Sequence, residues 1–342
     1  MSGVLISFVV PAYNEESLLA SCLEAILAEI ARARCPAEII VVNNSSTDRT
    51  REIAASFGAV AIIDEPHRGL VRARRAGCLA ARGRLIANID ADTILPPGWI
   101  DTVLAEFARQ PGLVALSGPF IHYDMSRTVR IIVAVFYQAA FLSYLLVRFV
   151  FRAGSMLQGG NFVVARSALD AAEAFNLDFS FYGEDTELAR RLSKLGAVKF
   201  SFALPAFSSG RRLAAEGLLQ VAFRYSINYL WTVVFRRPYS SGWLDFRHPV
   251  DISDAPLTSI LGVRSEPPER LARLAAIDGY RQCPSIWPPG ASAGRARCGR
   301  APPAAAGSAP ASDPSSSNSR QASSFPAKPP QGGRDSSSSF DR

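Results

Sequence analysis

The stretch RLIANIDADT, residues 84–93, is a short apolar run that ends in two carboxylates, Asp90 and Asp92. An apolar run of this length is typical of a buried strand. Burying a charge costs free energy unless the charge is paired or holds a metal, so two acids at a strand end need an explanation. Either they cap a helix starting near Trp99, or they sit in a solvated turn before Pro96, or they belong to a binding site.

Three similar units precede this stretch. Short apolar runs alternate with segments whose apolar residues recur every three or four positions, the pattern of one helix face. We expect strands at 5–10, 38–42, 59–63 and 84–89. We expect helices at 18–30 and at 71–82, and between them a helix that ends near residue 57. Four strand–loop–helix units in a row predict right-handed crossovers and a parallel sheet.

Polar residues follow each of these strands. They are Asn14-Glu15, Asn43-Asn44, Asp64-Glu65 and Asp90-Ala91-Asp92. In parallel sheets ligands bind outside the carboxyl ends of the strands, so the four segments predict one binding crevice. The sequence has no G-x-G-x-x-G turn after the first strand and no G-x-x-x-x-G-K-[ST] loop. If a nucleotide diphosphate binds, a Mg²⁺ or Mn²⁺ ion held by Asp90 and Asp92 would neutralise it.

A second acidic pair, Glu184-Asp185, follows Gly183 and begins a segment with helical leucine spacing. The helix dipole favours anions at this position. Capping explains one acid there, but it explains two adjacent acids less well.

Charge and cysteine content limit the functional classes. The formal net charge is +7, but residues 270–342 hold ten basic and four acidic residues, so residues 1–269 are nearly neutral. We therefore expect no nucleic-acid partner. The five cysteines show no metal-type spacing, and their odd number suits a reducing compartment. These features predict a cytoplasmic protein.

Two segments are strongly apolar, 131–147 and 218–235. The first is at the short limit for crossing a bilayer. Each is either a helix buried in the domain or an interfacial helix, which would give a peripheral contact with the cytoplasmic face of the membrane. Residues 269–342 are rich in Pro, Ser, Ala and Gly, and we expect them to be a disordered low-complexity tail.

With these segments placed, the chain resembles a family-2 glycosyltransferase of the GT-A fold over roughly residues 4–215. The resemblance rests on five motifs in order: Pro11-Ala12-Tyr13-Asn14-Glu15, Val41–Asp48, Gly69-Leu70 with Ala73-Arg74 and Gly77, Asp90-Ala91-Asp92, and Gly183-Glu184-Asp185. It implies a Rossmann-like, mostly parallel sheet flanked by helices, followed by C-terminal apolar helices and the tail. The implied organisation is a GT-A domain at 1–215, with a nucleotide-binding half at 1–118 and an acceptor half at 119–215, and an apolar extension at 216–268.

The resemblance also implies roles for individual residues. Pro11, Tyr13, Glu15 and Arg74 are assigned to donor binding, and Asn44 matches the position where the family usually has an aspartate that reads the base. Asp92 would ligate Mg²⁺ or Mn²⁺ on the donor diphosphate, and Asp90 would approach the ribose, the donor sugar and the metal. Asp185 would be the general base, with Glu184 as its neighbour or alternate.

The implied activity is a metal-dependent, inverting, hexosyltransferase-type transfer from a nucleotide-diphosphate sugar to a glycan or lipid-linked acceptor, as in cell-envelope synthesis. An inverting enzyme needs only one base. An acceptor hydroxyl is a poor nucleophile and needs a carboxylate, while the leaving diphosphate needs a cation. Two acidic sites with different tasks fit that chemistry.

The sequence departs from the family pattern at two places. Asn43-Asn44 stands where Asp-Asp is usual, which leaves the nucleotide base open. No Q-x-x-R-W follows the second acidic motif, and Ser208–Arg212 occupies that region, which favours a single transfer over processive synthesis. Arg211 and Arg212 either assist the diphosphate or begin a solvated helix. Two other functions stay open: a non-catalytic sugar-nucleotide-binding or membrane-associated relic, and a haloacid-dehalogenase-type phosphatase, although that family carries its acidic motif on the first strand.

Overall fold

The computed structural model describes residues 3–151, 156–173, 175–179, 181–235, 237 and 239. The chain divides into two units, Met1–Gly299 and Arg300–Arg342, and every described residue belongs to the first. The predicted tail at 269–342 and nearly all of the extension beyond residue 235 lie outside the described residues.

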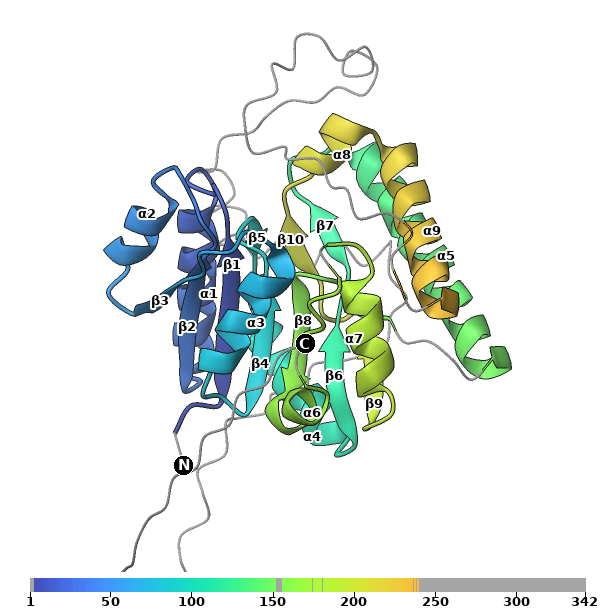
Figure 1. Ribbon diagram of the computed structural model, residues 1–342, viewed down its shortest axis with the longest axis horizontal. Helices are drawn as coiled ribbons and strands as arrows, with labels where there is room; N and C mark the ends of the chain where they lie inside the picture. Colours follow the sequence, from blue (N-terminus) through green and yellow to red (C-terminus); the bar gives the residue numbers. More distant parts are fainter. Residues whose placement is uncertain are drawn as a thin grey trace, which may run out of the picture. The chain divides into compact units, whose positions relative to one another are not determined.

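The described residues form a seven-stranded sheet in the order β3-β2-β1-β4-β8-β6-β9 and a three-stranded sheet in the order β5-β10-β7 (Figure 1). The strands are β1 (Ile6–Ala12), β2 (Ala37–Asn43), β3 (Val60–Asp64), β4 (Leu85–Ile89), β5 (Thr93–Ile94), β6 (Leu113–Ser117), β7 (Phe120–His122), β8 (Asn161–Ala165), β9 (Ala197–Phe200) and β10 (Ala206–Ser208). The helices are α1 (Leu19–Ala33), α2 (Thr50–Ser56), α3 (Leu70–Ala80), α4 (Trp99–Arg109), α5 (Arg127–Phe151), α6 (Arg166–Ala171), α7 (Glu184–Leu192), α8 (Arg211–Glu216) and α9 (Leu218–Phe235).

The expected parallel sheet is confirmed for the first four strands. β1 pairs in parallel with both β2 and β4, and β2 pairs in parallel with β3. β8 runs antiparallel to its neighbours β4 and β6, so the large sheet is mostly parallel. The mixed order follows from the connections, because β8 arrives after the long helix α5 and inserts between two strands that precede it in the chain.

Helices cover both faces of this sheet, which is why its central strands are apolar throughout. All seven residues of β1 are buried. Phe8 and Val10 point into a core shared with α1 and α4, and Val9 points into a second core shared with α3 and α7. Successive side chains of a strand alternate between faces, so a strand covered on both sides cannot show polar alternation.

Two elements differ from expectation. The residues after Asp92 form the short strand β5 rather than only a turn, because Thr93 and Ile94 pair with Ser208 and Phe207 of β10. The first apolar segment, residues 131–147, belongs to a longer helix than its length suggested, since α5 begins at Arg127 and ends at Phe151. Within the described residues, the part of α5 from Arg127 to Leu145 is long and apolar enough to cross a membrane.

Candidate active site

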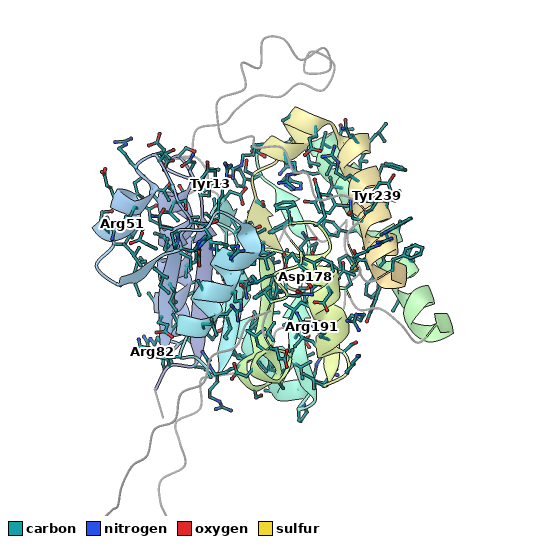
Figure 2. All side chains as sticks on the ribbon, in the orientation of Figure 1. Tyr13, Arg51, Arg82, Asp178, Arg191 and Tyr239 are labelled. Atoms are coloured by element: carbon teal, nitrogen blue, oxygen red, sulfur yellow. The ribbon has the colours of Figure 1, made fainter. Side chains whose placement is uncertain are left out.

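The polar segments after the first three strands lie at one edge of the large sheet, as the sequence predicted. In the strand register Ala12 lies beside Asn43, and Asn43 lies beside Asp64. Asn43 Nδ2 donates to Asp64 Oδ1 at 2.8 Å across this edge. Tyr13 stands at the upper end of the N-terminal strands in Figure 2.

Asp90 follows β4 at the same edge and is held from two sides. Nη2 of Arg74, on α3, donates to Asp90 Oδ1 at 2.8 Å. The Asp90 backbone N–H donates to the carbonyl of Gly160 at 3.2 Å. A β-carbon on Gly160 would lie 2.0 Å from Asp90 Oδ2, and φ at Gly160 is +82°. Only glycine fits this position without displacing the carboxylate.

Glu184 and Asp185 form the first turn of α7, where the sequence placed them. Gly183 precedes them in a left-handed conformation with φ +78° and packs against Thr232 of α9. The Gly159 N–H donates to Asp185 Oδ2 at 3.2 Å, and the Thr186 N–H donates to Asp185 Oδ1 at 2.7 Å. The Thr186 hydroxyl also donates to Oδ1 at 3.3 Å. These bonds fix the carboxylate plane, and Oδ2 keeps a second lone pair for another donor.

Arg74 joins the two acidic pairs. Its side chain is 1% exposed, and while Nη2 binds Asp90, Nη1 donates to Glu184 Oε1. The adjacent glycines Gly159 and Gly160 bond Asp185 and Asp90 respectively. One arginine and one glycine pair therefore hold the acidic residues that follow β4 and begin α7 in a single cluster.

Burial shifts the acid–base properties of this cluster. Loss of solvent raises the pKa of Asp185 above its ordinary value, against the opposing effects of the Thr186 N–H and Arg74. Loss of solvent also raises the pKa of Glu184, which Arg74 counters. A carboxylate with a raised pKa is a stronger base, as proton abstraction from a hydroxyl requires.

Asp92 lies beside Arg211, a cation whose role the sequence left open. The pairing of β5 with β10 brings the start of α8 to the strand end. There Arg211 Nη2 contacts Glu15 Oε1 at 2.6 Å and Asp92 Oδ2 at 3.2 Å. α8 begins at Arg211, as the helix-start interpretation expected, but the side chain is 27% exposed and pairs with two carboxylates. The sequence offered Gly210 followed by Arg211 and Arg212 as a signal for this contact. It could not show the partner, because 119 residues separate Arg211 from Asp92.

The residues after β1 are braced by their neighbours. The N–H of the buried residue Glu15 donates to Thr50 Oγ1 at 2.7 Å. The Arg68 guanidinium lies 4.1 Å from the centre of the Tyr13 ring. Pro11 is buried in β1, opposite Val42.

Asn44 is bonded in a way that only an amide allows. Its Nδ2 donates to the carbonyls of Glu65 at 3.1 Å and His67 at 2.8 Å, and its Oδ1 accepts from the Gly69 N–H at 2.7 Å. An aspartate would present acceptors to both carbonyls. Asn44 therefore orders the loop between β3 and α3, which explains physically why an amide stands here.

The donor set at Asp90 and Asp92 consists of carboxylate oxygens, which suit Mg²⁺ or Mn²⁺. Their side chains are 33% and 16% exposed, so an ion would reach them from the edge of the sheet. No cluster of three or more His, Cys, Asp or Glu side chains suited to a metal occurs among the described residues. The two aspartates fit an ion whose remaining ligands come from a bound phosphate group and water.

Comparison with known proteins identifies related sequences. A family model described as glycosyl transferase family 2 matches residues 7–172. Dolichyl-phosphate beta-glucosyltransferase ALG5D of Trichomonas vaginalis is 40% identical over 99 residues, which cover 26% of this chain and 30% of that protein. An uncharacterized glycosyltransferase of Mycobacterium tuberculosis is 37% identical over 114 residues, 33% of this chain and 49% of the relative. The alignments thus span less than half of each relative.

Among solved structures, a similar one is the mannosyltransferase PcManGT from Pyrobaculum calidifontis, determined in complex with GDP-Man and Mn²⁺. The two chains are 18% identical and superpose with a TM-score of 0.52, over 82% of this chain and 83% of that one. At this identity the similarity concerns the fold.

Proposed function

The chain belongs to glycosyl transferase family 2 and has the GT-A fold, and we propose that it transfers a sugar from a nucleotide-diphosphate donor to an acceptor hydroxyl. The observation that carries this proposal is the single cluster in which Arg74 binds both Asp90 and Glu184. The cluster places Asp90, which is suited to the sugar-donor side, beside Glu184 and Asp185, which are suited to the acceptor side. Membership of this family also argues against the alternative that the chain is a haloacid-dehalogenase-type phosphatase.

On the donor side we assign Pro11, Tyr13 and Glu15 to the wall of the nucleotide pocket. Asn44 acts through the loop at Glu65–Gly69 that it orders, and this loop carries Arg68 over the Tyr13 ring. Arg74 is buried and bonded on both sides, so its contribution to donor binding is to position Asp90.

We further propose that Asp92, with Asp90, holds a divalent cation, Mg²⁺ or Mn²⁺. The neighbour PcManGT binds Mn²⁺ with a sugar nucleotide, which supports this assignment. When bound, the ion supplies positive charge that stabilises a leaving diphosphate. Arg211 lies against Asp92 and offers a second cation at the same place.

On the acceptor side Asp185 is the proposed general base, with Glu184 as its neighbour. The Asp185 carboxylate accepts the hydroxyl proton while the hydroxyl oxygen attacks the anomeric carbon. The bond between that carbon and the diphosphate oxygen breaks on the opposite face, so the configuration inverts. One base is enough for this single displacement, and Asp185 is already oriented by two backbone N–H groups.

The finer features of the proposal concern substrate and place. We propose a hexosyltransferase that makes single transfers to a glycan or lipid-linked acceptor in the cytoplasm, with residues 1–118 as the donor half and 119–215 as the acceptor half. The dolichyl-phosphate glucosyltransferase among the relatives supports a lipid-linked acceptor.

Isothermal titration of the full chain with UDP and GDP, with and without Mn²⁺, tests the donor side. We expect binding of one nucleotide that depends on the metal. A screen of sugar nucleotides with glycan and lipid-phosphate acceptors then tests turnover. Binding without turnover would support the non-catalytic alternative, and no binding of either nucleotide would reject the proposal.

A further inference from the structure

Two helices, α5 and α9, expose large apolar side chains. On α5, Val135 is 62% and Leu142 is 65% exposed, and Ile131 on the same helix face is 42% exposed. On α9, Leu219 is 84% and Phe223 is 68% exposed, and they are four residues apart on one face. We call these residues the α5 strip and the α9 strip. Several large apolar side chains exposed on one helix face are more than the isolated exposed residues of an ordinary surface, and they indicate an interaction site.

The two helices lie next to each other (Figure 1). Tyr137 of α5 and Tyr225 of α9 are close enough for electrostatic interaction, and so are Tyr144 and Tyr229 further along the same helices. Leu218, at the start of α9, packs against the cluster formed by the inner face of α5. The strips therefore belong to one region of the molecule.

The charges on these helices have one sign. Neither Arg127–Phe151 nor Leu218–Phe235 contains an aspartate or glutamate. Arg127 and Arg130 are exposed at the first turn of α5. The surface thus combines apolar side chains with cations, the chemistry of an interfacial helix on an anionic membrane.

We propose that α5 and α9 dock this protein on the surface of an anionic lipid bilayer, with the two strips inserted between headgroups and the arginines against lipid phosphates. α5 lies in the membrane plane, because Val129, Val133 and Tyr137 of its inner face pack against Phe200 of β9. A helix crossing the bilayer would have to leave that cluster. The docking needs neither donor nor acceptor, so it stands apart from the proposed transfer activity.

A second copy of the chain fits this surface less well. In a symmetric dimer the same patch meets itself, so Arg127 and Arg130 would face a surface whose two helices carry no acidic residue. Anionic headgroups supply the missing countercharge.

The test is sedimentation of the full chain with phosphatidylcholine vesicles, with and without phosphatidylglycerol. We expect binding to anionic vesicles that falls about tenfold or more in Val135→Asp/Leu142→Asp and in Leu219→Asp/Phe223→Asp. Arg127→Gln and Arg130→Gln should each weaken it about fivefold. Leu79→Asp is the matched control, since Leu79 is 66% exposed on α3 and lies outside both strips. All variants keep the basic residues of 270–342, so any contribution from that segment is common to them.

A second measurement separates insertion from adsorption. Phe223→Trp should be quenched by brominated lipids, whereas Leu79→Trp should not. The proposal is overturned if the wild type stays in the supernatant with anionic vesicles, or if Leu79→Asp loses as much binding as the strip variants. It is also overturned if the strip variants abolish a concentration-dependent dimer instead, as light scattering would show.

Discussion

A β-carbon on Gly160 would stand 2.0 Å from Oδ2 of Asp90. The Asp90 carboxylate thus occupies the space that any side chain at position 160 would need. The Asp90 N–H donates to the Gly160 carbonyl, and Nη2 of Arg74 donates to the Asp90 carboxylate. Asp90 is therefore held between position 160 and Arg74.

Gly160→Ala should therefore displace Asp90 and weaken Mn²⁺-dependent nucleotide binding by about tenfold or more, the loss expected for a charge-assisted contact. Gly98→Ala is the matched control, because Gly98 also has a positive φ, +93°, but has open space at the β-carbon position. Both variants bear left-handed strain of roughly 1–2 kcal/mol. Titration calorimetry should distinguish them, and equal nucleotide affinities would contradict the role given to Gly160.

Arg74→Met should destabilise the fold by about 3–5 kcal/mol, because it leaves two carboxylates beside each other without their cation. Urea unfolding measures this loss. Adding Glu184→Gln to Arg74→Met should restore part of it. Arg51→Met removes an ion pair to Asp64 that is exposed on both sides, and it should change stability little. The interpretation fails if the two single arginine variants unfold alike.

Asp185→Asn should lower turnover by roughly 10²–10⁴-fold, the usual contribution of a general base, and leave nucleotide binding intact. Asp178→Asn makes the same charge change at an exposed position before α7 and should turn over normally. Steady-state rates and calorimetry on the same preparations separate the two effects. Near-normal turnover in Asp185→Asn would remove Asp185 from the base role.

The pH dependence of kcat/KM should follow Asp185. Burial raises the pKa of this carboxyl, and the base works only when ionised. The rate should therefore fall as pH decreases, with an acid limb above the ordinary aspartate value of about 3.9. The residual activity of Asp185→Asn should lack that limb. A limb at or below the ordinary value would contradict the assignment.

Arg211→Gln should tighten Mn²⁺ binding to the free protein and weaken nucleotide binding in the presence of Mn²⁺. The first effect follows because Arg211 and a cation compete for Asp92, and the second because a positive charge near the diphosphate is lost. We expect about tenfold for each. Arg212→Gln is the control, because Arg212 binds the Tyr225 hydroxyl and the Phe181 ring instead. Manganese titration by electron paramagnetic resonance gives the first affinity.

Several site features could be predicted because they depend on local patterns. Apolar runs and helical spacing placed β1, β2, β3 and β4, and the crossover rule then brought Asn43, Asp64 and Asp90 to one edge. The sequence also placed Glu184 and Asp185 at a helix start, where Gly183 precedes them. Each inference needed only residues that are neighbours in the chain.

Other features could not be predicted, because each depends on contacts between distant segments. The amide of Asn44 binds two carbonyls of the next loop, which no spacing rule reveals. Two residues of β5 pair with β10 and bring Arg211 to Asp92 and Glu15.

The sequence by itself determined the first four strands, the helices between them and the edge where acidic residues gather, because hydrophobic periodicity and chain chirality suffice for these features. Only the tertiary structure decided which charges meet. Arg74 reaches Asp90 and Glu184 because α3, β4 and α7 pack around one buried guanidinium. Ion pairing acts over a few ångströms, and the packing of distant segments decides which side chains come that close.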